Sequence, residues 1–149
     1  MRRPHYLLFA LAIITLLSSL LTACSSSSSV KHNSSMQMAA LSEMPPEVQS
    51  APVVVQEAYQ FAAANPEVLE AIPCYCGCGA MGHTSNYSCY FTGESAGDGL
   101  AFDPHALGCS ICVDITQDSM RLLQQGKSMS EIRAYIDGTY ASFGPSNMP

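Results

Sequence analysis

The sequence has few basic residues: 6 Lys and Arg stand against 12 Asp and Glu, for a formal net charge of −6. Nucleic-acid binding depends on Lys and Arg that neutralise phosphates, and an acidic chain is poorly suited to it. The chain also lacks a polybasic segment that would hold it on anionic lipid headgroups. We therefore expect no nucleic-acid partner, and no membrane contact that depends on charge.

Sequence patterns of hydrolytic enzymes are also lacking. The chain offers no recognisable Ser-His-Asp set, no paired carboxylates in an apolar setting and no glycine-rich loop that would cradle a phosphate. These absences favour a role other than enzymatic hydrolysis. On balance they favour a protein that is not an enzyme.

The chain lacks an apolar run of the roughly 20 residues that a transmembrane helix needs. The run of residues 6–21 is shorter, follows an Arg pair and leads into the sequence LTAC, which ends at Cys24. A basic start, a short apolar core and a small residue before a Cys are typical of a bacterial lipoprotein signal peptide. We predict removal of residues 1–23, lipidation of Cys24 by acyl chains such as palmitate, and a location on the extracytoplasmic face of the cell membrane. Without that signal, 4 basic and 12 acidic residues remain, for a net charge of −8.

Composition divides the rest of the chain into three parts. Residues 24–51 are Ser-rich and polar, so they should form a flexible tether that buries too little apolar surface to become ordered. Residues 52–144 carry helical periodicity and the remaining Cys, and we expect them to form one Cys-rich helical domain. Residues 145–149 follow the last predicted helix and should be a disordered tail.

Helical signals recur along residues 52–144. Apolar residues at helical spacing predict a helix over residues 53–64, and Asn65-Pro66 predicts a short one over residues 67–71. Asp103-Pro104 predicts the start of a helix that runs to residue 125. The last helix should begin at a capping box formed by Ser128 and Glu131. Its apolar face is predicted to contain Ile132, Tyr135, Ile136, Tyr140 and Phe143.

Residues 72–102 show no sustained period and are rich in Gly and Cys, which indicates an irregular loop. We therefore predict an all-α fold: a small helical bundle of two to three packed helices with a Cys/Gly-rich irregular loop. Its core should be too small to order this loop without cross-links or metal.

The remaining Cys form a pattern suited to a metal site. They are Cys74, Cys76, Cys78, Cys89, Cys109 and Cys112. Alternating Cys in a Gly-containing loop can converge on one ion, and two Cys one helical turn apart can complete the site. His83 and His105 lie in the same region, and a helix from residue 104 would place His105 on the same stripe as Cys109 and Cys112. We predict that all eight residues act as ligands or lie beside the ligands, with Cu(I) or Zn(II) favoured by the soft sulfurs.

Disulfides are the main alternative, because six Cys outside the cytoplasm could form three of them. Cys74, Cys76 and Cys78 are too close in sequence to pair easily with one another, so each would need a partner among the other three Cys. The two His favour metal, since a domain held only by disulfides needs no imidazole. A mixture of metal and disulfides remains open.

A family resemblance rests on these residues. The segment PCYCGC at residues 73–78, followed by Gly82-His83, Cys89 and the stretch from His105 to Cys112, resembles the bacterial lipoproteins named for this motif. The resemblance spans roughly residues 58–140 and implies a Cys-rich lipoprotein without implying a particular reaction. Residues 126–140 are also similar to the last helix of the helical-hairpin domains of cytochrome c maturation proteins, which handle apocytochrome thiols through a Cys pair. That similarity implies a helical fold here.

Three functional hypotheses follow. The leading hypothesis is a lipid-anchored extracytoplasmic protein that binds zinc or copper through its Cys and His. The second is a thiol-disulfide redox protein that uses Cys109 and Cys112 near the start of a helix, where the helix dipole lowers the pKa of a thiol. The third is a disulfide-linked module that binds another envelope protein through aromatic residues of the loop, namely Tyr75, Tyr87, Tyr90 and Phe91.

Overall fold

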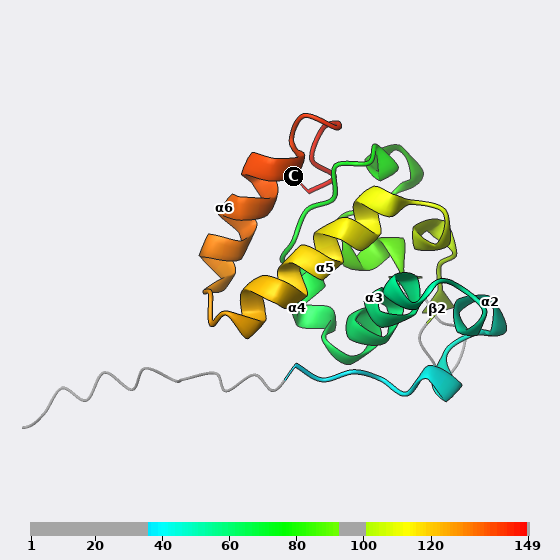
Figure 1. The fold of residues 1–149 in the computed structure, drawn as a ribbon. Helices are drawn as coiled ribbons and strands as arrows, with labels where there is room; N and C mark the ends of the chain where they lie inside the picture. Colours follow the sequence, from blue (N-terminus) through cyan, green and yellow to red (C-terminus); the bar gives the residue numbers. More distant parts are fainter. Residues whose placement is uncertain (1–35, 93–100, 149) are drawn as a thin grey trace, which may run out of the picture. The chain divides into compact units, whose positions relative to one another are not determined.

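The computed structural model describes residues 36–92 and 101–148 (Figure 1). The helices are α2 (Pro46–Gln49), α3 (Val53–Ala64), α4 (Pro66–Glu70), α5 (Ser110–Gln124) and α6 (Met129–Tyr140). Short 3-10 helices are η2 (Leu41–Glu43), η3 (Cys78–Met81), η4 (Tyr87–Cys89) and η5 (His105–Leu107). Two strands complete the set, β1 (Phe91–Thr92) and β2 (Ala101–Phe102). The predicted signal peptide and Cys24 lie outside the described residues.

Helix α5 is the centre of the packing, because it contacts both α3 and α6 (Figure 1). Its buried face carries Ile115 and Leu122, and α6 covers this face with Ile132 and Ile136. From the other side, α3 contributes Phe61, which is fully buried. Burial of each such side chain stabilises the fold by about 2 kcal/mol. The predicted small helical bundle is therefore present.

The sequence signals located three helices well. Helix α3 has the predicted bounds, and α4 begins at Pro66. At the start of α6, the Ser128 hydroxyl accepts a hydrogen bond from the backbone N–H of Glu131, whose carboxylate accepts one from the backbone N–H of Ser128. This reciprocal pair is the predicted capping box.

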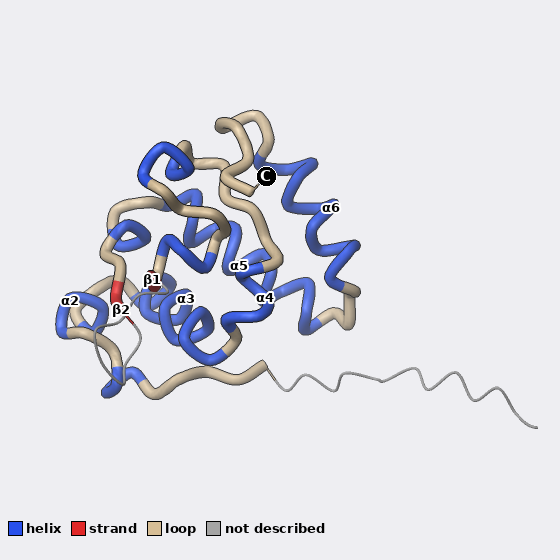
Figure 2. Tube along the Cα trace, turned by 180° about the vertical axis from the view of Figure 1, so that it is seen from behind, coloured by secondary structure: helices blue, strands red, loops and turns tan. Residues whose placement is uncertain are grey.

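The fold is mostly helical but not strictly all-α. Strands β1 and β2 pair antiparallel, with Phe91 opposite Phe102 (Figure 2). Both rings lie near the fully buried Tyr59 of α3, whose ring centroid is 4.8 Å from that of Tyr90. The prediction of an irregular loop missed this small sheet, because two residues per strand are too few to produce a periodic pattern.

The predicted helix over residues 104–125 is broken in two. After η5 the chain passes through Gly108, and α5 begins only at Ser110, with Cys109 as its N-cap in an extended conformation. Gly108 has no side chain to restrict its backbone, so it weakens a continuous helix at this point. The break moves Cys109 to the very start of α5 and Cys112 into its first turn.

The predicted tether extends too far along the chain. Val48 of α2 is fully buried and Met44 is nearly so. The backbone N–H of Ala39 donates to the carbonyl of Gln60 at 3.0 Å, and the Gln60 side chain returns a hydrogen bond to the carbonyl of Ala39 at 2.7 Å. Residues from 36 onward therefore belong to the folded unit rather than to a tether. The prediction differed because the few buried apolar residues of this segment barely change its polar average composition.

Two further predictions, both for the C-terminal part of the chain, differ from the structure. Asn147 is hydrogen-bonded to the Cys-rich loop, so residues 145–148 are not a disordered tail. On α6, Tyr135 is 39% exposed and Phe143, beyond the helix, is 60% exposed, so the buried face is reduced to Ile132, Ile136 and Tyr140. Of the described helices, none has the length and apolar character to cross a membrane.

Candidate metal centre

The motif segment approaches α5 through a tight turn. Gly77 has a φ of 85°, in the left-handed region that suits glycine, and η3 begins at the next residue. Cys74 and Cys78 are buried on either side of this turn, while Cys76 is partly exposed. The Tyr75 hydroxyl donates to the carboxylate of Asp137 on α6 at 2.6 Å. The motif is thereby fixed to the helical bundle.

The start of α5 supplies a second pair of sulfurs. The Sγ atoms of Cys109 and Cys112 are 3.2 Å apart. The Cys112 sulfur also lies 3.5 Å from that of Cys74 and 3.6 Å from that of Cys76. His105 adds its Nε2, 3.4 Å from the Cys76 sulfur. The predicted convergence of His105, Cys109 and Cys112 is thus present, although on a broken rather than a continuous helix.

The loop beyond the motif places Cys89 against Cys78, with 3.6 Å between their sulfurs. Asn86 anchors this part of the loop, because its backbone N–H donates to the Ile72 carbonyl and its side-chain amide donates to the Thr116 hydroxyl of α5, each at 2.7 Å. These bonds are fully buried. They hold the Cys89 segment in place against the helix.

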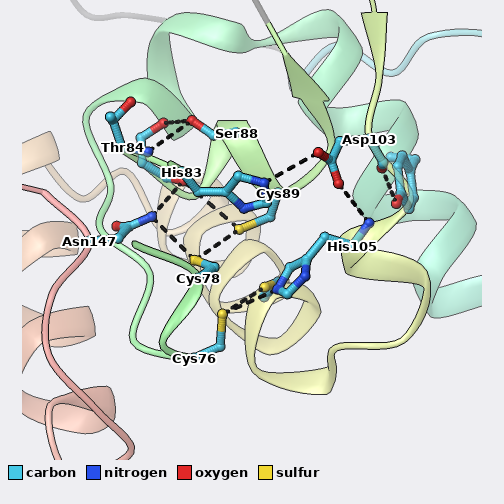
Figure 3. Close-up of polar contacts among 12 residues, drawn as sticks. Cys76, Cys78, His83, Thr84, Ser88, Cys89, Asp103, His105 and Asn147 are labelled. Atoms are coloured by element: carbon cyan, nitrogen blue, oxygen red, sulfur yellow. Dashed lines mark hydrogen bonds and ion pairs between the residues drawn. The ribbon is translucent and has the colours of Figure 1, made fainter. Parts of the chain in front are cut away.

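His83 and His105 lie edge to face, with ring centroids 5.1 Å apart, and both contact Asp103 (Figure 3). His83 Nε2 is 3.3 Å from Asp103 Oδ2, and the backbone N–H of His105 donates to Asp103 Oδ1 at 2.8 Å. The other ring nitrogen of His83, Nδ1, is buried and has no hydrogen-bond partner. An Nε2–H that donates to the carboxylate leaves Nδ1 with a free lone pair.

Within the described part of the chain, the eight predicted ligands form three overlapping groups of four. In each group, one possible ligand atom per residue lies within 4.8 Å of the others. The groups are Cys74, Cys76, Cys78 and Cys89; Cys76, His105, Cys109 and Cys112; and Cys78, His83, Cys89 and His105. These groups could hold a metal ion. Every predicted Cys and His ligand belongs to at least one of them.

The six Cys of this region are free thiols. Their closest sulfurs are 3.2 Å apart, whereas a disulfide requires about 2.05 Å. The predicted alternative of three disulfides is therefore not the state that the structure describes. The arrangement is instead the open cluster of sulfurs that a soft ion requires.

Electrostatics inside the cluster favour a negative charge on Cys74 and oppose one on its buried neighbours. Hydrogen bonds from Cys112 and Cys89 lower the pKa of Cys74 far below the ordinary value for a thiol. Desolvation raises the pKa of Cys76 and of Cys78, and the hydrogen bond to Cys74 raises that of Cys112. A positive ion would reverse this balance, because it stabilises several thiolates at once.

Two residues outside the predicted ligand set support the site. Asp103, predicted only as a helix cap, contacts the ring of His83 and the backbone N–H of His105 through its carboxylate. Asn147, predicted to lie in a disordered tail, accepts a hydrogen bond from the backbone N–H of Cys74 at 2.7 Å through its side chain and donates toward the Cys78 sulfur at 3.4 Å (Figure 3). No local pattern marks Asn147, which lies 69 residues after Cys78.

The aromatic residues of the loop do not form a docking surface. Tyr75, Tyr87, Tyr90 and Phe91 are all less than 9% exposed. They fill the space between the loop and the helices, so the surface proposed for an envelope partner is absent at these four side chains.

Comparison with known proteins agrees with the motif. A family model described as a protein of unknown function with PCYCGC motif matches residues 13–148. No curated protein and no solved structure matches the chain, so the weaker similarity to cytochrome c maturation proteins is not shown. The family match covers most of the chain and includes all eight clustered Cys and His. The chain belongs to the PCYCGC-motif family.

Proposed function

We propose that this protein binds a soft metal ion, Cu(I) or Zn(II), through its Cys and His cluster. The observation that carries this proposal is the convergence of six free thiols and two imidazoles from distant parts of the chain. Structural disulfides would bring sulfurs together in bonded pairs. This cluster instead places each sulfur near two or more potential ligands.

The distances support a tetrahedral ion. With a metal–sulfur bond of about 2.3 Å, two sulfurs of a tetrahedral site lie about 3.8 Å apart. The Sγ separations of 3.6 Å from Cys76 to Cys112 and 3.6 Å from Cys78 to Cys89 are close to this value. Small side-chain rotations would therefore be sufficient for coordination.

The charge balance also supports a bound cation. In the described part of the chain, each of the three Lys and Arg side chains forms an ion pair with a carboxylate three or four residues away. The pairs are Arg121 with Asp118, Lys127 with Glu131 and Arg133 with Asp137. No Lys or Arg of these residues is left to neutralise buried thiolates. A metal ion supplies the positive charge that the protein does not.

The cellular location is a separate part of the proposal. The short apolar run and the LTAC sequence before Cys24 support a lipid anchor on the extracytoplasmic face of the cell membrane. Thiols there oxidise readily unless metal protects them, so the anchor and the metal centre fit one another. An envelope protein that delivers or receives the metal is a suitable partner.

Mass spectrometry of the purified mature protein tests metal binding. Under native conditions we expect bound zinc or copper, and after denaturation and chelation we expect six thiols that react with an alkylating agent. Three disulfides and no affinity for either metal would contradict the proposal.

One observation favours a second function, thiol-disulfide exchange. Cys109 is the N-cap of α5, and its sulfur lies 3.2 Å from that of Cys112, an arrangement that suits a redox pair. In that case Cys109→Ser would abolish exchange with a dithiol, and a chelator would leave the exchange rate unchanged. A Ser110→Ala variant provides the control.

A further inference from the structure

We infer that the cluster holds two metal ions in two Cys₃His sites. This inference rests on the proposed metal-binding function and deepens it. The outer site consists of Cys76, His105, Cys109 and Cys112. The inner site consists of Cys74, Cys78, Cys89 and His83.

The number of candidate ligands is sufficient for two ions. A tetrahedral ion such as Zn(II) takes four ligands, and eight converge here. One of the three groups already contains the whole outer site. The four residues left over come from the other two groups. Cys74 and His83 each lie within 4.8 Å of both Cys78 and Cys89, but no group contains Cys74 and His83 together. The eight residues therefore divide into two sets of four without any ligand used twice, and in the inner set Cys74 and His83 would approach each other when the ion binds.

The outer site is a tight group around the start of α5. Cys112 Sγ lies 3.2 Å from Cys109 Sγ and 3.6 Å from Cys76 Sγ, and Cys76 Sγ lies 3.4 Å from His105 Nε2. These three contacts connect the four ligands in an unbroken series. They span the break before α5, which gives His105 and Cys109 independent orientations.

The inner site has its own evidence for an ion. Cys78 and Cys89 place their sulfurs 3.6 Å apart, and the buried Nδ1 of His83 lacks a hydrogen-bond partner. Asp103 contacts the opposite nitrogen of that ring. A carboxylate behind a histidine is the usual arrangement for a metal ligand, because it fixes the ring and strengthens the free nitrogen as a donor. Cys74 lies within 4.8 Å of both Cys78 and Cys89 and completes the set.

The two sites would carry equal charge. Each Cys₃His set supplies three thiolates, of which one Zn(II) neutralises two, so a net charge of −1 remains at each site. Cys74 joins the sites, because its sulfur is 3.5 Å from Cys76 of the outer site and 3.5 Å from Cys112 of the outer site.

The two sites differ in their exposure to solvent. Cys74, Cys78, Cys89 and His83 of the inner site are all buried, whereas Cys76 and Cys109 of the outer site are partly exposed. Asn147 adds a cover over Cys78. A chelator should therefore remove the outer ion first and the inner ion more slowly.

The test is zinc stoichiometry by native mass spectrometry on the reduced mature protein, with Zn(II) alone as the added metal. We expect two ions, and loss of zinc to a chelator in two phases. The double variant Cys109→Ser/His105→Ala should retain one ion and lose the fast phase. The double variant Cys89→Ser/His83→Ala should lose the slow phase, and Ser110→Ala should retain both ions.

The outcomes separate the two claims. One zinc ion in the unaltered protein, or a single phase of loss, would overturn the two-ion inference and leave the proposed function intact. Failure of the unaltered protein to retain either zinc or copper would overturn both. If a double variant does not fold, a Co(II) titration of the unaltered protein decides: absorption from cobalt–thiolate bonds should rise up to two equivalents, and saturation at one would contradict the inference.

Discussion

Single residues decide how the chain turns around the centre. Gly77 has a left-handed φ of 85° between Cys76 and Cys78, so the relative placement of these two sulfurs depends on a conformation that other residues adopt at a cost. Asn147 then closes the turn from a distant part of the chain. The Gly in the motif was predictable as a turn, but its partner Asn147 was not, because nothing near it in sequence marks a role.

Gly77→Ala is expected to destabilise the protein by about 1 kcal/mol, because an L side chain is strained at this φ even though no atom lies within 4 Å of the added Cβ. Gly108→Ala is the matched control. It has equally open space and a negative φ of −109°, so its stability should not fall. Urea denaturation of both variants measures the difference, and equal loss in the two would contradict the assignment of strain.

Asn147→Ala removes three side-chain hydrogen bonds, those with the Cys74 backbone, the Cys78 sulfur and the Ser85 carbonyl. We expect a loss of about 1–2 kcal/mol in the free energy of unfolding. Ser142→Ala, an exposed change in the same region, should have no effect. If Asn147→Ala unfolds at the same urea concentration as the unaltered protein, these bonds do not contribute to stability.

At the scale of elements, α3 and α6 were predictable because their signals are local. Apolar spacing marks α3, and the residues of the capping box mark α6. The break before α5 was not predictable in the same way, because Asp103-Pro104 is also a valid helix start. The Asp103 carboxylate does accept a hydrogen bond from the backbone N–H of His105, as a cap would, but the chain leaves the helical conformation at Gly108 and Cys109. The candidate ligands were predictable from residue type alone, whereas their division into groups depends on this break.

The capping box of α6 gives a pH dependence with a definite sign. Hydrogen bonds from the backbone and hydroxyl of Ser128 lower the pKa of Glu131 from 4.5 to about 2. Because the pKa is lower in the folded state, the stabilisation is fully present above the unfolded value of 4.5 and is lost as pH falls toward about 2. The Glu131→Gln variant should therefore lose less of its free energy of unfolding on acidification than the unaltered protein does.

Urea denaturation at neutral pH and at about pH 3 measures the effect through linkage. The difference between the unaltered protein and Glu131→Gln should shrink at the lower pH. A difference that does not change with pH would indicate that the charge on Glu131 contributes nothing to the cap.

For the whole molecule, the bundle and the loop have different sources of order. The bundle buries aliphatic side chains of α3, α5 and α6, while the loop is tied down by buried hydrogen bonds to α5 and by its sulfurs. The distinction between a bundle and a Cys-rich loop was predictable from composition. The packing of residues 36–51 on α3 was not, because only a few side chains such as Val48 carry it.

Removal of metal should therefore loosen the loop more than the bundle, because binding free energy is part of the folding free energy of the loop. Hydrogen exchange of the zinc-loaded protein, with and without a chelator, measures this. Backbone amides of residues 72–92 should exchange faster after chelation, while those of α6 change little. Equal exchange in both states would show that the loop is ordered without metal.

The cluster of aromatic rings beside the centre has an optical consequence. The sequence contains no Trp, so near-ultraviolet signals come mainly from its 7 Tyr. Tyr90 is buried, packs edge to face on Tyr59 and donates a hydrogen bond to the carbonyl of Cys112 at 2.9 Å. Zn(II) has a filled d shell and no colour of its own. The circular dichroism of these tyrosines is consequently a built-in spectroscopic reporter of an otherwise silent ion.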